Sequence, residues 1–362
     1  MRNLWSSIGS LGVFGQLIAT STTAPTASQE IKEAGTLLYG GPALSDESWG
    51  VNVGADYILW QISQEGLETA GCYYVDDPIL NPIPAFGLNF YPKFGMRSGF
   101  KSHVAVNLDQ YENVDLFLEY MWLQTSTYGN QGELPPYSVD YVHTLPTSSY
   151  VHFYNSTYKF AYNVLDFEIG RLSSFAKDSF NLRPFFGIRG VWNTSTWAPS
   201  TIFVSDEEFE FYEIFTTSNQ TVRGAGVRAG FDMTWQFYPS SSEFGSIDIF
   251  STCAASGVYG NTSVRTMTRL DPADNLENLN LYSNVKSSLN RTIPVIDLSF
   301  GLGWNINFGG AESNDYNLEL HTSWDTQTWI NYGKSQVRSQ LCLIKPQTLS
   351  VQGLTVGGSL TF

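Results

Sequence analysis

Several extended segments of this chain carry charged side chains on one face and apolar side chains on the other. Glu319, His321 and Asp325 share one face of an extended segment, and Asp115 and Glu119 share one face of another. A histidine beside carboxylates has the groups for general acid and base chemistry, whereas acids that face bases form ion pairs or a field that filters charged solutes. We interpret these rows as paired charges, because this interpretation requires no further catalytic group.

The sequence motifs of common enzymes are missing. The four histidines, His103, His143, His152 and His321, do not have the H-E-x-x-H spacing of a zinc site. A G-x-S-x-G nucleophile motif and a glycine-rich phosphate loop are also absent from the sequence. We therefore expect that the protein is not an enzyme and that it uses no cofactor and no metal.

Composition limits the class of partner. The 362 residues include 19 Lys and Arg against 34 Asp and Glu, which gives a formal charge of -15. This charge argues against nucleic acid or an anionic membrane surface as the main partner. Aromatic residues make up 15% of the chain and there are 32 glycines, a mixture that favours β-structure rich in turns over disorder.

The N-terminal residues have the character of an export signal. Arg2 precedes a glycine-interrupted apolar stretch from Leu11 to Ala19, and small residues follow. We expect a signal peptide over residues 1–27 with cleavage between 19 and 27, a periplasmic segment over 28–47 and a barrel domain over 48–362. A buried N-terminal helix is the alternative. No later segment approaches ~18 uninterrupted apolar residues, so a membrane-embedded form would have to be a β-barrel.

Ten segments alternate in hydropathy with a period of two, and the connections between them are alternately short and long. The predicted strands lie near residues 48–62, 94–108, 113–125, 157–170, 181–197, 222–238, 246–262, 292–308, 315–330 and 348–362. This rhythm predicts an all-β fold, a transmembrane antiparallel up-and-down β-barrel of about 10 strands (range 8 to 16) with short periplasmic turns and long extracellular loops.

The alternation also predicts which face meets lipid. In residues 224–235, Val227, Phe231 and Trp235 would face outward, opposite Arg228 and Asp232. A soluble β-sandwich alternates too, but its strands are usually ~5 to 6 residues long, whereas these exceed the ~9 to 11 residues that cross the hydrocarbon. Large aromatic residues lie near the predicted strand ends, where an aromatic belt is expected: Trp49, Trp60, Trp122, Trp192, Trp235, Tyr238 and Trp329.

The chain ends inside its last predicted strand. A terminal edge strand in water would leave a row of backbone groups unpaired, so we expect residues 348–362 to pair with the first strand and close the barrel. Phe362, Leu360 and Val356 would then form the membrane-insertion signal. Such a terminal pattern resembles the signal read by the bacterial barrel assembly machinery, and this machinery, outer-membrane lipid and lipopolysaccharide are the expected partners.

Three stretches resemble the major outer-membrane-protein-like porins of legionella and chlamydia-related bacteria. They are LRPFFGIRGVW at 182–192, GAGVRAGFDMTW at 224–235 and LSVQGLTVGGSLTF at 349–362, with the same rhythm of strands and turns over most of the chain. The resemblance implies a pore-forming barrel in the bacterial outer membrane. It carries no catalytic residue to this chain, and the acidic segment at 205–215 departs from the family pattern.

The inward face of the predicted strands carries charges of both signs. The expected pore-lining residues are Asp56, Arg97, Lys101, His103, Asp115, Glu119, Asp166, Glu168, Arg183, Arg189, Arg228, Asp232, Asp297, Glu319 and Asp325. They would either line a water-filled lumen that filters small polar solutes or, because a ten-stranded barrel is narrow, pair with one another as a plug. Extra strands near residues 149–155 would widen the lumen. The family resemblance favours a pore.

The chain contains three cysteines, two of them in long loops. Cys72 and Cys342 lie in the first and last long loops, which closure brings together, so a Cys72 to Cys342 disulfide is one hypothesis and two unpaired thiols are the other. Cys253, within a strand, is expected to be unpaired.

The function expected is an outer-membrane porin for ions and small hydrophilic solutes. The alternative is a non-conducting structural barrel or adhesin whose loops bind partners. The oligomeric state, a homo-oligomer included, stays open.

Overall fold

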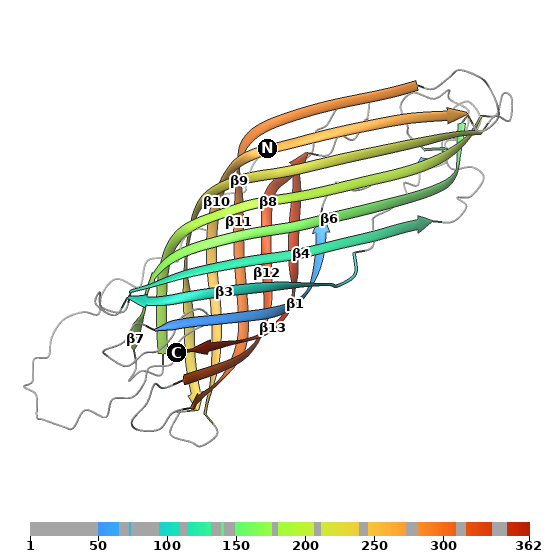
Figure 1. Ribbon diagram of the computed structural model, residues 1–362. Helices are drawn as coiled ribbons and strands as arrows, with labels where there is room; N and C mark the ends of the chain where they lie inside the picture. Colours follow the sequence, from blue (N-terminus) through green and yellow to red (C-terminus); the bar gives the residue numbers. More distant parts are fainter. Residues whose placement is uncertain are drawn as a thin grey trace, which may run out of the picture. The chain divides into compact units, whose positions relative to one another are not determined.

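Ten long strands of the described residues form a closed antiparallel sheet (Figure 1). The computed structural model describes residues 50–64, 72–73, 94–108, 114–131, 139–140, 149–175, 180–205, 211–238, 245–272, 281–308, 316–334 and 346–362. The barrel strands are β1 (Val51–Gln64), β3 (Arg97–Leu108), β4 (Val114–Gln131), β6 (Ser149–Arg171), β8 (Phe180–Ser205), β9 (Phe211–Tyr238), β10 (Ser246–Pro272), β11 (Leu281–Phe308), β12 (Tyr316–Lys334) and β13 (Pro346–Thr361). The prediction of an all-β barrel of about ten strands is confirmed.

The first and last barrel strands pair with one another. β13 lies antiparallel to β1, with Val53 opposite Leu360 and Gln64 opposite Leu349. The pairing continues past the end of β13, because Val51 and Phe362 exchange two backbone hydrogen bonds of 3.0 and 3.1 Å. Every barrel strand thus has a neighbour on each side, and the terminal strand has no exposed edge.

We call the end of the barrel at which β3 joins β4 the turn end, and the end at which β4 joins β6 the loop end. The prediction that all connections at the loop end are long is wrong, because β8 joins β9 through residues 206–210 alone. The strands extend further toward the loop end than the sequence predicted. β9 and β11 have 28 residues each, whereas β3 has 12. Residues 149–155 belong to β6 itself, so the extra strand considered there does not widen the barrel.

The extension at the loop end is an open sheet. β11 pairs with β12 only from Val295 to Phe308, while its preceding residues, from Leu281 onward, continue to pair with β10. Three short strands of the described residues lie outside the closed ring: β7 (Ser173–Phe175) pairs with β8, and β2 (Cys72–Tyr73) pairs with β5 (Val139–Asp140). The extension projects six strands, β4, β6 and β8 to β11, beyond their shorter neighbours.

The outer face of the barrel carries the apolar rows that the alternation predicted. On β11, Leu298, Phe300 and Leu302 are each exposed by half or more, while Asp297 and Gly301 beside them are buried. Val227, Phe231 and Trp235 form a similar row on β9. Such a band of apolar side chains matches a hydrocarbon environment, because a soluble monomer seldom exposes so large an apolar surface. None of the described residues forms a helix of the length and hydropathy needed to cross a membrane.

A charge placed in the middle of this band is expected to destabilise the inserted barrel. Leu302→Arg, near the centre of the apolar row of β11, should lower the free energy of unfolding in lipid by ~2 to 4 kcal/mol. Phe308→Arg, at the turn end of the same row, should cost ~0 to 1 kcal/mol because the guanidinium reaches the interface. Urea titration of both variants in vesicles measures the difference, and equal costs would contradict the assigned lipid face.

Several predictions concern residues outside the described parts of the chain. The signal peptide at 1–27, the segment at 28–47 and Cys342 all lie there, so the cleavage site and the Cys72 to Cys342 disulfide stay predictions. Cys253 on β10 is a free thiol, as expected.

Candidate functional site

The inward-facing side chains fill the lumen in layers. Along β6 from the loop end, Tyr158, Phe160 and Tyr162 come first and Asp166 and Glu168 follow, all of them buried. β12 shows the same order, with Trp329 nearer the loop end than Asp325 and His321. We call these the aromatic layer and, nearer the turn end, the charged layer.

Arg183 of β8 is the centre of one group of ion pairs in the charged layer. Its Nε donates to Asp115 Oδ2 across 2.8 Å, and its Nη1 lies 2.8 Å from Asp232 Oδ2 and 3.3 Å from Glu168 Oε2. These carboxylates come from β4, β6 and β9, and the guanidinium is 1% exposed. Charge-assisted bonds of this kind are shorter and stronger than neutral ones, so Arg183 of β8 fixes these three neighbouring strands against one another.

Arg189 and Arg228 form a second group of ion pairs. Arg189 makes a two-pronged contact with Asp166, at 2.7 Å from Nε and 2.6 Å from Nη2, and its Nη1 lies 2.8 Å from Asp297 Oδ2. Arg228 contacts Glu168 at 2.8 Å and also Asp297. Asp297, on β11, thus receives two guanidinium groups from β8 and β9.

On the opposite side of the lumen, Lys101 pairs with Asp325. Their Nζ and Oδ2 atoms are 2.6 Å apart, and Asp325 also accepts hydrogen bonds of 2.6 Å from Ser299 and Thr355. Between this pair and the arginines lies a cavity of about 50 Å³ lined by residues that include Glu119, Arg228 and Asp297. A single water needs ~10 to 15 Å³ of such space, so this polar cavity has room for a few waters.

The aromatic layer lies on the loop side of these charges. Trp329 contacts Tyr162 edge to face, with ring centroids 5.9 Å apart, and Arg189 lies over its ring at 5.9 Å. Trp60, Tyr158, Phe160 and Tyr332 are as fully buried. The structure corrects the expectation that Trp60 and Trp329 belong to a lipid-facing aromatic belt, since both point into the lumen. Trp192 and Trp235 do face outward.

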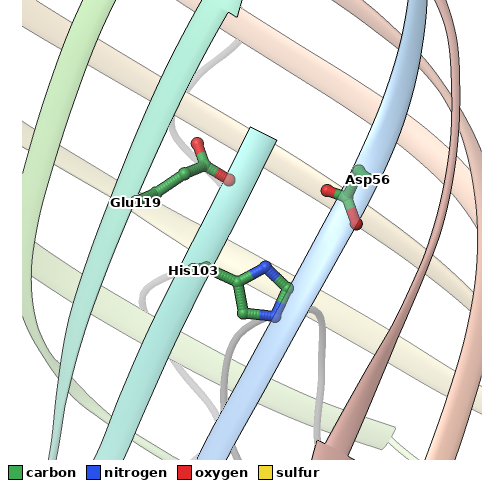
Figure 2. Close-up of side chains that lie close together, drawn as sticks. All are labelled: Asp56, His103 and Glu119. Carbon is green, nitrogen blue, oxygen red and sulfur yellow. The ribbon is translucent and has the colours of Figure 1, made fainter. Parts of the chain in front are cut away.

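Nearer the turn end, Asp56, His103 and Glu119 lie on the neighbouring strands β1, β3 and β4. Figure 2 shows the two carboxyl groups turned toward one another with the imidazole ring of His103 beside them. One ligand atom from each residue lies within 4.8 Å of those of the other two, and all three side chains are buried. His321 Nε2 is 3.1 Å from Asp56 Oδ1. Among the described residues, this cluster has the donor types that hold a metal ion.

Most residues predicted to line the lumen are buried there. These are Asp56, Lys101, His103, Asp115, Glu119, Asp166, Glu168, Arg183, Arg189, Arg228, Asp232, Asp297, Glu319 and Asp325. Arg97 is the exception. It is exposed at the loop end of β3 and donates to the Ser126 carbonyl oxygen across 2.7 Å. Its cross-strand partner Trp60 fills the lumen at that height, which leaves the guanidinium on the rim.

Two features of the lumen were not predicted from the sequence. The aromatic layer was missed because Ile58, Trp60 and Ile62 alternate with side chains that are themselves partly apolar, so hydropathy does not distinguish the faces there. The Asp56, His103 and Glu119 cluster was missed because its members lie far apart in the sequence. Only the register places them together: Gly54 lies opposite His103, and His103 lies opposite Glu119.

Residues 93–362 match the family described as the Legionella pneumophila major outer membrane protein precursor. The chain belongs to this family. The match covers nine of the ten barrel strands, all but β1, and it agrees with the lipid-facing rows and the closed sheet. The protein is therefore an outer-membrane β-barrel of this family, located in the bacterial outer membrane. No curated protein matches the chain.

Solved structures of other outer-membrane barrels are similar to the chain at low identity. The outer membrane protease OmpT from Escherichia coli is 10% identical, with coverage of 88% of this chain and 99% of OmpT and a TM-score of 0.36. A Pseudomonas aeruginosa FadL homologue is 8% identical, with coverage of 87% and 90% and a TM-score of 0.23.

The OmpT likeness corrects our exclusion of an enzyme. We expected no enzyme because common motifs are missing, and the likeness to a protease contradicts that expectation. The likeness does not assign a proteolytic activity to this chain, because it is too distant to carry a residue or a reaction across.

Proposed function

We propose that this member of the family forms a narrow pore for ions and small hydrophilic solutes across the outer membrane. The observation that carries the proposal is the charged layer, in which acids and bases from opposite walls of the barrel converge on a polar cavity. A path lined by such groups replaces part of the hydration of a passing ion.

The energetic cost of the charged layer supports a role in passage. A well-packed apolar core is often as stable as a buried ion-pair network or more stable, because each ion loses several kcal/mol of hydration when it is buried. A barrel that only anchors loops could fill its lumen with apolar side chains, as this barrel does in its aromatic layer. Charged side chains nearer the turn end are explained more directly by contact with water and solutes.

The balance of buried charge predicts cation selectivity. Among the described residues, ten buried Asp and Glu side chains face four buried Lys and Arg side chains, an excess of six acidic residues. We expect a reversal potential on the cation side in a planar bilayer under a KCl gradient. Asp297→Asn should reduce that selectivity, because it removes one carboxylate beside the cavity. Asp271→Asn, on β10 beyond the aromatic layer, is the control and should leave the reversal potential unchanged. Anion selectivity of the wild type would contradict the proposal.

Lipid, lipopolysaccharide and the barrel assembly machinery are proposed partners. The exposed apolar rows support the first two, and the outward positions of Val356, Leu360 and Phe362 beside the closed β1 to β13 seam support the third. The size of the cavity limits the solutes to small ones.

A second candidate function is a non-conducting barrel that presents its loop end to partners. The extension of six strands favours it, since β8 to β11 continue well beyond the strands that complete the ring. Joining β10 to β11 by a short turn, with residues 264–287 removed, separates the two functions. Loss of binding to host or envelope proteins with unchanged conductance would support the second function, in which the loop end binds partners. Loss of conductance would count against a separate role of the extension.

A further inference from the structure

We propose that Asp56, His103 and Glu119 form a binding site for a divalent transition metal ion in the lumen. The three side chains come from adjacent strands and place one nitrogen and two carboxylate groups within 4.8 Å of one another. Zinc is bound by imidazole nitrogen and carboxylate oxygen at ~2.0 to 2.2 Å, so small rotations of these side chains bring all three into its coordination sphere.

The sheet register builds this site from backbone geometry. His103 and Glu119 are direct cross-strand partners on β3 and β4, and Gly54 is the partner of His103 on β1. Asp56 is two residues from Gly54 and therefore on the same face. Because directly opposed and diagonal neighbours on one face lie within side-chain reach, the three donors converge without any loop. Strands hold the side chains of a site in a more precise geometry than loops do.

Two glycines make room for the donors. A methyl group at Gly54 would overlap the imidazole ring of His103, and one at Gly357 would overlap the carboxylate of Asp56. Gly357 is the cross-strand partner of Asp56 on β13. The neighbouring strands therefore leave space where the donors lie, and a larger side chain at either position would displace one of them.

The charges of the cluster suit a divalent cation. Asp56 and Glu119 contribute two carboxyl groups, and each is at most 7% exposed. The carboxylate of Asp166 repels that of Glu119 electrostatically, so a cation between Asp56 and Glu119 would offset repulsion as well as burial. Lys101 is a nearby base, and its Nζ lies 2.6 Å from Asp325 Oδ2. A bound dication would stabilise the ionised form of both carboxyl groups, which burial otherwise disfavours.

The surroundings resemble the outer shell of a metal site. His321 lies 3.1 Å from Asp56 and orients its carboxylate, while the ring of Phe117 lies 5.7 Å from that of His103. Ligating carboxylates in metal sites are held by such hydrogen-bonding neighbours. A nitrogen donor favours zinc and similar metals over magnesium or calcium, which take oxygen ligands. The inference does not depend on conduction, because a non-conducting barrel could hold the same ion.

Calorimetric titration of the refolded barrel in detergent micelles with Zn²⁺ alone tests the site. We expect one Zn²⁺ per barrel, a higher midpoint of thermal unfolding in its presence, and no comparable effect of Mg²⁺. His103→Gln and Glu119→Gln, which keep the side-chain volumes close to those of the wild type, should each weaken binding by at least about tenfold. Asp248→Asn, a buried lumen carboxylate outside the cluster, is the matched control and should bind Zn²⁺ as the wild type does.

The outcomes distinguish a built site from other binding. Absence of a Zn²⁺ effect on the wild type would overturn the inference, and so would equal affinity of the wild type and both cluster variants, which would indicate binding elsewhere on the protein. Heat-modifiable gel mobility verifies folding of each variant. If one variant does not fold, the other decides, and Gly54→Ala, which crowds His103 but removes no donor, gives a third comparison with the same expected loss.

Discussion

Arg183→Ala is expected to lower the free energy of unfolding of the barrel by about 3 to 5 kcal/mol, because it removes one partner of a buried ion-pair group. The substitution leaves Asp115, Glu168 and Asp232 without the guanidinium that holds them within 2.8 to 3.3 Å. Three carboxylates then repel one another inside the lumen. Equilibrium unfolding in urea, followed by tryptophan fluorescence and heat-modifiable mobility, measures the loss.

Arg97→Ala is the matched control for this prediction. Arg97, like Arg183, was predicted to face the lumen. It is instead exposed at the rim, where it contacts a backbone carbonyl. Its removal should change the free energy of unfolding little, because exposed polar contacts contribute little. If the two arginine variants were equally stable, the ion-pair group around Arg183 would not contribute to the stability of the barrel.

Trp329→Ala is expected to increase the single-channel conductance severalfold and to destabilise the barrel by ~3 to 5 kcal/mol. The indole is fully buried in the aromatic layer between Tyr162 and Tyr332. Its removal opens space in the aromatic layer and also removes the ring beneath the Arg189 guanidinium. Planar-bilayer recordings compare the variant with the wild type at the same salt concentration.

The control for the tryptophan prediction lies on the outer face. Trp235→Ala removes an indole of the same size from the lipid-facing row of β9, where the side chain is half exposed. It should leave the conductance unchanged. If Trp329→Ala conducted no better than Trp235→Ala, the aromatic layer would not limit the passage of ions.

The number of strands, and the side of each strand that meets lipid, could be predicted because both depend on a local pattern. Period-two alternation fixes which side of a strand meets lipid, and the apolar row of β11 is a clear instance. The loop-end extension of β9 and β11 was missed because apolar side chains do not recur there at every second residue. On β11, for instance, Ser287 separates Val285 from Leu289 on the same face. Hydrogen bonding to neighbouring strands, which sequence does not display, continues the sheet there.

The lumen could be predicted only in part. The buried arginines Arg183, Arg189 and Arg228 were placed inward correctly by parity, yet their partners depend on the stagger of strands around the ring. Parity alone does not place Arg97 correctly. Its position along β3, opposite Trp60, decides that it lies on the rim. The Asp56, His103 and Glu119 cluster depends on register across three strands, and sequence spacing does not encode it.

The most direct test of the central claim is the current carried by the wild-type barrel in a planar bilayer, on protein shown to be folded by heat-modifiable mobility. The account predicts small stepwise currents, below those of wide barrels of ~16 to 18 strands, with a reversal potential on the cation side. Silence from a folded barrel would contradict it, and would mean that the charged and aromatic layers together seal the lumen.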